Sequence, residues 1–103
     1  RPGFADRVLS GKERSIYSER RCSAEFLAGR FAAKEALLKA FGTGLRNGLL
    51  FNEIEITCGP SGEPLAGFRG RALQVFEGLG GGKALVTISH EKEYAVAFAV
   101  IEG

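Results

Sequence analysis

The chain has 103 residues, of which 45% are hydrophobic and 25% charged, and its formal net charge is +2. These values fit one ordinary globular domain and exclude a disordered chain. The small net charge gives no general reason to expect a nucleic-acid partner, although it leaves room for a local site that binds phosphate or an acidic protein. No apolar run is long enough to cross a membrane and no signal peptide is visible, so we expect a cytoplasmic protein without a membrane partner.

The first segment, residues 3–20, has the pattern of two short helices. Ser10 is expected to cap the second one, because Glu13 follows three residues later and completes a capping box. Arg20 and Arg21 close the segment and add positive charge at its end. We therefore expect a helical N-terminal region with a basic rim.

Residues 26–44, FLAGRFAAKEALLKAFGTG, form the strongest helical stretch of the chain. Ser23 precedes this stretch and can cap it, while Gly42 and Gly44 are expected to end it, as glycine commonly does at a helix C-terminus. Residues 45–51 are then expected to form a loop.

The next segment, residues 51–59, alternates Ile54 and Ile56 with polar residues, which predicts a strand with one face toward solvent. Residues 60–64 carry the glycine and prolines of a turn and lead into a short strand over 64–68. We therefore expect two strands joined by a tight connection.

The C-terminal part predicts one more helix and a hairpin. In the helix, residues 69–80, we place Leu73, Phe76 and Leu79 on one face. Residues 84–90 and 94–102 are then expected to pair as antiparallel strands joined by a short turn. Helices grouped with antiparallel strands give an α+β fold, with the sheet packed against the long central helix and with no internal domain boundary over residues 1–103.

The central helix carries cations in an unusual place. At 100° per residue, one arc collects its large apolar side chains, and Arg30 and Lys34 project from the middle of that arc. A charge buried in an apolar surface needs a compensating partner. Either the aliphatic stems carry the charges out to water, or the charges meet an anion held at that face.

The opposite arc of the same helix holds a second pair, Glu35 and Lys39, among four alanines. One interpretation is an exposed i,i+4 ion pair that stabilises the helix by about 0.3–0.5 kcal/mol. The other is a site, because a carboxylate can bind Mg²⁺ together with substrate phosphates, and basic side chains complement phosphate charge. Taken with Arg30 and Lys34, this pattern favours phosphate chemistry.

Ser89 and His90 end the predicted strand 84–90, beside the hairpin turn. A lone histidine is often structural or simply exposed, but loops beside strand ends also present functional side chains. Both interpretations of His90 stay open on the residues alone. One histidine and two cysteines without CxxC spacing give little for a zinc site.

The central stretch FLAGRFAAKEALLKAFGTG closely resembles the corresponding helix of the holo-acyl-carrier-protein synthases, the short group of 4′-phosphopantetheinyl transferases. The segments FADRVLSGKE, FNEIEIT and VTISHEKEYAVAFAVIE resemble the entry segment and the later strands of the same family. The resemblance covers nearly the whole chain. It implies transfer of the phosphopantetheine arm of coenzyme A to a serine of apo-acyl carrier protein, with release of adenosine 3′,5′-bisphosphate.

The resemblance also implies roles for individual residues. Glu35 matches a glutamate that binds magnesium, and it is our candidate for taking the proton of the incoming serine, directly or through a water. Lys39 matches a lysine near the coenzyme A phosphates. The other positions that match the nucleotide and phosphate site are Arg30, Lys34, Gly42, Gly44, Ser89 and His90. Arg7 matches an arginine that meets the acidic carrier protein.

In two further respects the resemblance sets expectations. The family's first strand carries a G-[IL]-D-[IL] motif with a second magnesium ligand, followed by a basic helix, and the present sequence begins after both. We therefore describe the chain as one transferase domain that lacks this strand and part of the first helix. The family is trimeric with sites shared between subunits, so a homotrimer is expected.

Two alternatives remain open at this point. The chain could be a non-catalytic module that binds coenzyme A or the carrier protein and has lost a metal ligand. It could also be a purely structural oligomerisation domain, although this would leave Arg30 and Lys34 without a role. Which carrier protein would be served, that of fatty acid or of polyketide synthesis, does not follow from the sequence.

Overall fold

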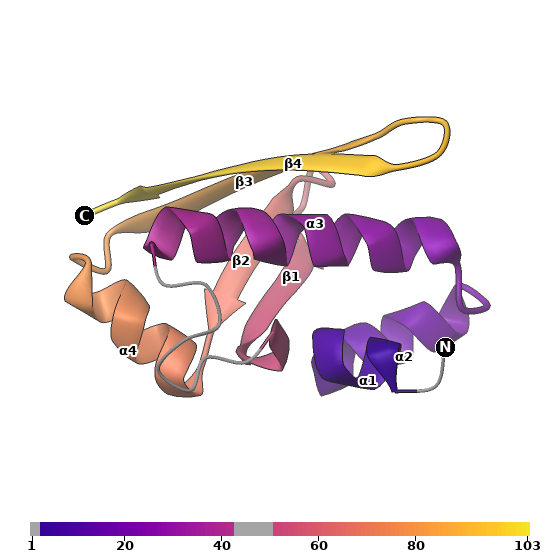
Figure 1. Ribbon diagram of the computed structural model, residues 1–103, viewed down its shortest axis with the longest axis horizontal. Helices are drawn as coiled ribbons and strands as arrows, with labels where there is room; N and C mark the ends of the chain where they lie inside the picture. Colours follow the sequence, from indigo (N-terminus) through magenta and orange to yellow (C-terminus); the bar gives the residue numbers. More distant parts are fainter. Residues whose placement is uncertain (1–2, 43–50) are drawn as a thin grey trace.

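The computed structural model describes residues 3–42 and 51–103 and has an α+β fold, as predicted (Figure 1). In chain order the elements are α1 (Phe4–Val8), α2 (Gly11–Glu19), α3 (Ala24–Phe41), the 3-10 turn η1 (Phe51–Glu53), β1 (Ile54–Cys58), β2 (Pro64–Phe68), α4 (Gly70–Gly78), β3 (Lys83–His90) and β4 (Ala95–Glu102). The predicted loop and Gly44 lie outside the described residues, except that Phe51 opens η1.

The helix ends follow the predicted capping chemistry. Ser10 Oγ accepts a hydrogen bond from the backbone N–H of Glu13 at 3.2 Å, and Glu13 Oε1 accepts one from the backbone N–H of Ser10 at 2.9 Å. Ser23 Oγ caps α3 by accepting from the N–H of Phe26. Gly42 ends α3 with φ = 82°, a backbone conformation that glycine adopts without strain. The capping box, the α3 cap and the glycine stop are confirmed.

The strands form two separate antiparallel hairpins. β1 pairs with β2, and β3 pairs with β4 in a register that sets Leu85 opposite Val100 and Thr87 opposite Phe98. The single sheet expected from the sequence is therefore divided into two two-stranded ladders. Helix α3 runs along the β3–β4 hairpin, with β1 and β2 behind it in the view of Figure 1.

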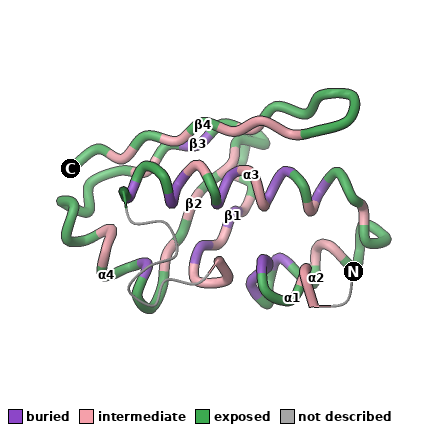
Figure 2. The backbone as a smooth tube through the Cα atoms, in the orientation of Figure 1, coloured by how far each residue is buried: buried purple, intermediate pink, exposed green. Residues whose placement is uncertain are grey.

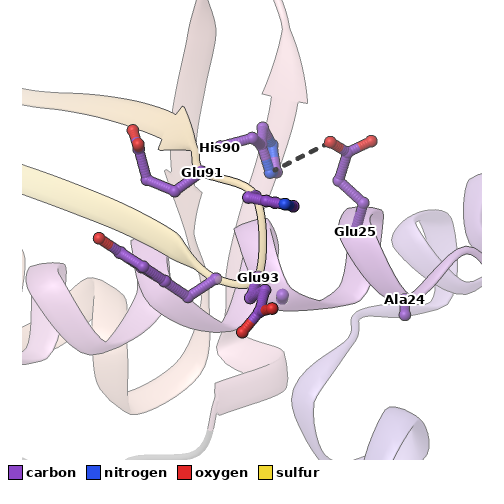
Figure 3. Close-up of a pocket in the computed structure, with 8 residues that line it drawn as sticks. Ala24, Glu25, His90, Glu91 and Glu93 are labelled. Carbon is purple, nitrogen blue, oxygen red and sulfur yellow. Dashed lines mark ion pairs between the residues drawn. The ribbon is translucent and has the colours of Figure 1, made fainter.

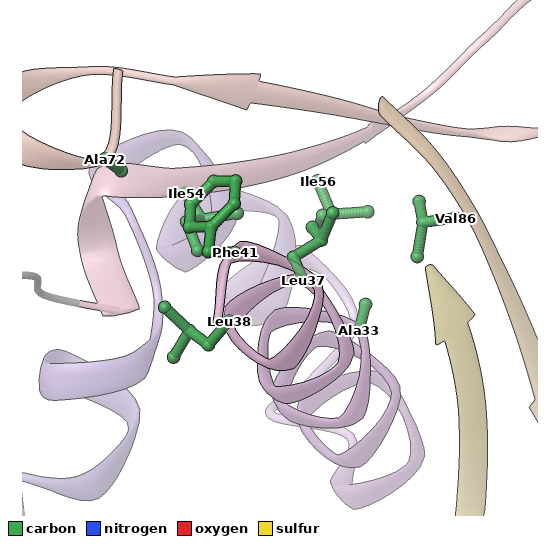
Figure 4. Packing of buried hydrophobic residues seen from close by; sticks show 8 residues of the cluster. All are labelled: Ala33, Leu37, Leu38, Phe41, Ile54, Ile56, Ala72 and Val86. Carbon is green, nitrogen blue, oxygen red and sulfur yellow. The ribbon is translucent and has the colours of Figure 1, made fainter. Parts of the chain in front are cut away.

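The main core lies between α3 and both hairpins (Figures 2 and 4). Ile54 and Ile56 are fully buried against Leu37 and Phe41, as the alternation of β1 predicted. The buried members of this cluster are Ala33, Leu37, Leu38, Phe41, Ile54, Ile56, Ala72 and Val86. A second, smaller cluster of Val8, Leu9 and Phe26 joins α1 to the first turns of α3. The long helix thus connects the two ends of the molecule.

The packing face of α4 differs from the prediction. Ala72 is fully buried and Val75 and Phe76 pack on the core, whereas Leu73 and Leu79 are 37% and 42% exposed. Buried residues at i, i+3 and i+4 define the stripe of a helix that faces a core. Ala72 starts this stripe and is fully buried in the core cluster.

Among the described residues, no helix is long and apolar enough to cross a membrane.

Candidate active site

The partner of Lys34 is a carboxylate of the same chain, that of Glu13. Its side chain is fully buried, and its Nζ donates hydrogen bonds to Glu13 Oε1 at 2.6 Å, to the Val8 carbonyl at 2.6 Å and to the Phe51 carbonyl at 3.1 Å. Three acceptors occupy the three protons of an ammonium group. This corrects the expectation that Lys34 lines a phosphate site, because no donor remains for a ligand.

Burial lowers the pKa of Lys34 from its usual value of 10.5, since the charged form has lost its hydration. The Glu13 carboxylate acts in the opposite direction by its charge and its hydrogen bond. Glu13 is itself fully buried and accepts a further bond from the backbone N–H of Ile56 at 2.6 Å. The pair is therefore built into the core with complete hydrogen bonding.

Arg30, one turn before Lys34, has a different environment. It is about nine-tenths buried, and its guanidinium lies 4.4 Å from the centroid of the Phe26 ring. Arg20 approaches the same ring at 5.2 Å. Within the described residues, Arg30 Nε has no hydrogen-bond partner. The two cations therefore differ: the ammonium group of Lys34 has all its hydrogen bonds, whereas Arg30 has an Nε–H without an acceptor among the described residues.

Glu35 and Lys39 line a groove between α3 and β4. Both side chains are exposed, and in the part of the chain that the structure describes no ion pair joins them. The groove has a volume of about 530 Å³, and alanines of both elements, together with Val96 and Phe98, form its walls. The alanines on this side of α3 therefore leave open space, as the helical projection predicted, and the two charges stand beside it.

Magnesium is compatible with this groove but has few ligands there. No group of three or more His, Cys, Asp or Glu side chains in the described residues could hold a metal ion. Mg²⁺ usually keeps several waters and binds through one or two carboxylates plus substrate phosphates. A single exposed carboxylate, Glu35, can supply one oxygen ligand of such a shell.

His90 lines a second hollow of about 260 Å³, between the first turns of α3 and the β3–β4 turn (Figure 3). Its Nδ1 lies 3.9 Å from Glu25 Oε2. The imidazole rests directly on Gly29, because a Cβ added there would lie 2.7 Å from His90 Cε1. Lys92 and Tyr94 line the same hollow from the turn. The lining is of mixed charge, because His90, Lys92 and Tyr94 share it with the carboxylates of Glu25, Glu91 and Glu93.

Ser89 and His90 point to opposite sides of the hairpin. Side chains alternate along a strand, so Ser89 shares the outer face with Leu85 and Thr87, while His90 shares the helix-facing side with Ile88. Ser89 Oγ donates a hydrogen bond to Glu91 Oε2 at 3.1 Å. Among the described residues, Ser89 lines neither the groove of Glu35 nor the hollow of His90.

The remaining predicted site residues lie apart from the grooves. Arg7 is exposed on α1, near the N-terminal end of the described chain. Gly42 ends α3, and among the described residues no atom lies within 4 Å of an added Cβ. Its position fits a turn that a ligand could approach, and its φ of 82° favours glycine there independently of neighbouring side chains. Gly44 lies outside the described residues.

Several residues of these grooves were not anticipated. Gly29 could have been identified from the sequence. Glycine inside a helix is destabilising relative to alanine, so its presence suggests that another group packs closely against the helix backbone. Lys92 and Tyr94 carried no pattern, and they enter only because the hairpin turn folds back over α3. The sequence predicted Glu13 only as part of a capping box, and its carboxylate also accepts a hydrogen bond from Lys34.

Known proteins are similar to this chain over most of its length. The model of the 4′-phosphopantetheinyl transferase superfamily matches residues 1–99. The chain is 46% identical over 100 residues to a holo-[acyl-carrier-protein] synthase of Escherichia coli (strain K12 / MC4100 / BW2952), covering 97% of the chain and 79% of that protein. It is 40% identical over 99 residues to the one of Koribacter versatilis, covering 96% and 79%.

Solved structures give the same result. The holo-[acyl-carrier-protein] synthase of Neisseria meningitidis superposes with a TM-score of 0.83 at 33% identity, covering 99% of the chain and 82% of that structure. The Helicobacter pylori enzyme in complex with coenzyme A superposes with a TM-score of 0.79 at 28% identity, covering 96% and 81%. The chain therefore spans about four fifths of each of these proteins.

Proposed function

The chain belongs to the 4′-phosphopantetheinyl transferase superfamily, and we propose that it transfers the phosphopantetheine arm of coenzyme A to a serine of apo-acyl carrier protein. The observation that carries this proposal is the identity of 46% over 97% of the chain to a holo-[acyl-carrier-protein] synthase. The coenzyme A complex of the Helicobacter pylori relative supports the choice of donor. The products would be holo-acyl carrier protein and adenosine 3′,5′-bisphosphate.

In this reaction the serine oxygen bonds to the phosphorus that carries the pantetheine arm. The bond from that phosphorus to the bridging oxygen of the pyrophosphate breaks, and the adenosine bisphosphate leaves. Such a transfer needs alignment and neutralisation of charge more than covalent help from the protein. The groove beside Glu35 and Lys39 supports this role, because it presents a carboxylate and an ammonium group to one open space.

We assign the two side chains separate tasks. The carboxylate of Glu35 takes the proton of the serine hydroxyl, and it also supplies an oxygen ligand for Mg²⁺. The ammonium group of Lys39 lies near the leaving phosphate and compensates its growing negative charge. When bound, magnesium would polarise the phosphate oxygens.

The nucleotide end of coenzyme A is assigned to the N-terminal half of α3. His90 and Lys92 are the donors that this hollow offers to a phosphate, and Glu25, Glu91 and Glu93 line it as well. Arg30 lies outside this lining and has an Nε without a hydrogen-bond partner among the described residues. Arg7 is proposed to meet the acidic carrier protein, because it is exposed on α1. We also propose that coenzyme A contacts Ser89, Gly42 and Gly44.

We further propose a homotrimer with the sites at subunit interfaces. The outer face of the β3–β4 hairpin supports this assembly, because Phe98 is 72% exposed beside Leu85 and Val100. A patch of this kind on a small protein commonly marks an interaction surface. Phe98 also borders the groove of Glu35, so a neighbouring subunit on this face would complete that groove.

The test is a transfer assay with the full-length protein, Mg²⁺, coenzyme A and an apo-acyl carrier protein, read by intact-protein mass spectrometry. We expect the carrier to gain the mass of one phosphopantetheine, and to gain nothing when its acceptor serine is replaced by alanine. The alternative of a non-catalytic binding module predicts coenzyme A binding in calorimetry with no gain of mass. That second result would refute the enzymatic proposal.

A further inference from the structure

A buried, fully hydrogen-bonded polar pair in the described core has no part in the reaction proposed above. It is the buried pair of Glu13 and Lys34, which lies behind α3 on the side away from the groove. We propose that this pair is a positioning device that fixes the rotation and axial position of α3 and thereby places Glu35 and Lys39. The proposal rests on the proposed function and names further residues on which that reaction depends.

The pair connects α3 to each of its neighbours on one side. Lys34 Nζ holds the C-terminal end of α1 through the Val8 carbonyl, and it holds η1 through the Phe51 carbonyl. Glu13 belongs to α2 and holds β1 through the N–H of Ile56. One ammonium group and one carboxylate thus tie α3 to four other elements, and all these bonds are directional.

On the side of α3 that faces the β3–β4 hairpin, the described residues provide a weaker polar contact, from His90 Nδ1 to Glu25 Oε2 at 3.9 Å. There α3 faces β4 through alanines, and the groove of Glu35 runs between the two elements. Contacts among small apolar side chains are not directional, so they permit small rotations and shifts of the helix. Among the described residues, the side chains of Glu35 and Lys39 make no hydrogen bond or ion pair. Their positions therefore follow the backbone of α3.

Sequence neighbours on a helix are related by a rotation of 100°, so Glu35 moves as a rigid extension of the backbone at Lys34. A rotation of α3 about its axis, or a slide along it, would carry Glu35 and Lys39 together away from the reacting atoms. Displacements near 1 Å can lower the rate of a positioned reaction about 100-fold. The buried pair is thus a positioning element, and neither of its members touches the substrate.

The experiment compares Lys34→Met and Glu13→Asp with the control Ile54→Ala. Lys34→Met removes the ammonium group, whereas Glu13→Asp keeps both charges but withdraws the carboxylate by one methylene. Ile54 is fully buried in the same core, and its side chain makes none of these hydrogen bonds, so Ile54→Ala lowers stability without breaking the pair. Folded fractions are measured by denaturation, and all kinetics are taken where each variant is folded.

We expect both pair variants to lose about 10- to 100-fold in kcat, with a smaller change in the KM for coenzyme A. Ile54→Ala should keep kcat close to that of the wild type. A kcat that is unchanged in folded Glu13→Asp and Lys34→Met, or that falls equally in Ile54→Ala, would overturn the proposal. If Lys34→Met does not fold, Glu13→Asp and the control decide the question.

A second readout separates this proposal from the proposed function. Backbone amide shifts and hydrogen exchange of residues 35–39 are recorded by NMR without substrate. We expect larger shift changes and faster exchange there in the pair variants than in Ile54→Ala. Wild-type protein without transfer activity would refute the proposed function, while these spectra would still support or overturn the positioning of α3.

Discussion

Replacing Gly29 by alanine should separate the stability of the protein from its affinity for coenzyme A. Alanine inside a helix is favoured over glycine by about 0.5–1 kcal/mol. The new Cβ would lie 2.7 Å from His90 Cε1, a contact that real side chains do not tolerate. The imidazole is 37% exposed and can swing outward into solvent, so His90 yields and the helix backbone stays in place.

The cost of that movement in stability is small. The contact between His90 and Glu25 spans 3.9 Å between exposed groups, and pairs of this kind contribute about 0–1 kcal/mol. The gain in helix stability from alanine and the loss of the His90–Glu25 contact therefore nearly cancel. The Tm of Gly29→Ala should stay within a few degrees of the wild type. The loss in binding is larger, because a hydrogen bond to a charged group is worth about 1.5–3 kcal/mol. This corresponds to a rise in the Kd for coenzyme A of about 10- to 150-fold.

Calorimetric titration with coenzyme A and thermal unfolding measure the two quantities. Gly78→Ala serves as the control, because an added Cβ at Gly78, also in a helix, meets no atom of the described residues within 4 Å. The control should bind coenzyme A like the wild type. Unchanged binding by Gly29→Ala would refute the placement of His90 at the ligand, and a large drop in its Tm would refute the claim that the imidazole yields.

Three further predictions concern the core, the buried pair and the hairpin. Leu37→Ala should lower the free energy of unfolding by about 2–5 kcal/mol in denaturant titrations, because Leu37 is fully buried; a loss below 1 kcal/mol would contradict the packing. Since the folded pKa of Lys34 lies below 10.5, the unfolded chain binds more protons in the alkaline range below that value. The stability of the wild type relative to Lys34→Met should therefore rise with pH up to about 10.5, and a constant difference would contradict the lowered pKa. Val100→Lys should dissociate the proposed trimer in sedimentation experiments, whereas Leu73→Lys on α4 should not; an intact assembly in Val100→Lys would exclude this face of the hairpin.

The regular elements were predictable because their patterns are local. The alternation of Ile54 and Ile56 predicts one buried face for β1, since side chains alternate with a period of two. Ser10 and Glu13 predict a helix start because both bonds of a capping box lie within four residues. The projection of α3 likewise separated the alanine side, with Glu35 and Lys39, from the apolar side.

Tertiary partners were not predictable in the same way. Lys34 was recognised as needing an anion, but its partner Glu13 lies 21 residues earlier and appeared only as a cap. The predicted packing face of α4 was wrong because three large side chains suggested it, whereas the structure buries the small Ala72 and leaves Leu73 and Leu79 partly exposed. The division into two hairpins depends on how the strands are placed in space, which no local pattern encodes.

The candidate site also has features that local patterns predict and features that depend on tertiary contacts. The opposite directions of Ser89 and His90 follow from strand alternation and could have been derived from the predicted hairpin. The support of His90 by Gly29 and the contribution of Lys92 and Tyr94 depend on the hairpin turn lying over α3. The chemistry itself came from the family resemblance, since charges on a helix indicate a phosphate ligand without identifying it.

The transfer activity of Glu35→Gln, measured beside wild type and Glu77→Gln, tests the central claim most directly. Glu35 and Glu77 are both exposed helix residues, so neither change should disturb folding, and only Glu35 lines the groove. We predict that Glu35→Gln fails to modify apo-acyl carrier protein while it keeps the wild-type Tm, and that Glu77→Gln modifies it at the wild-type rate. Normal phosphopantetheine transfer by Glu35→Gln would contradict the assignment of the reaction to this groove.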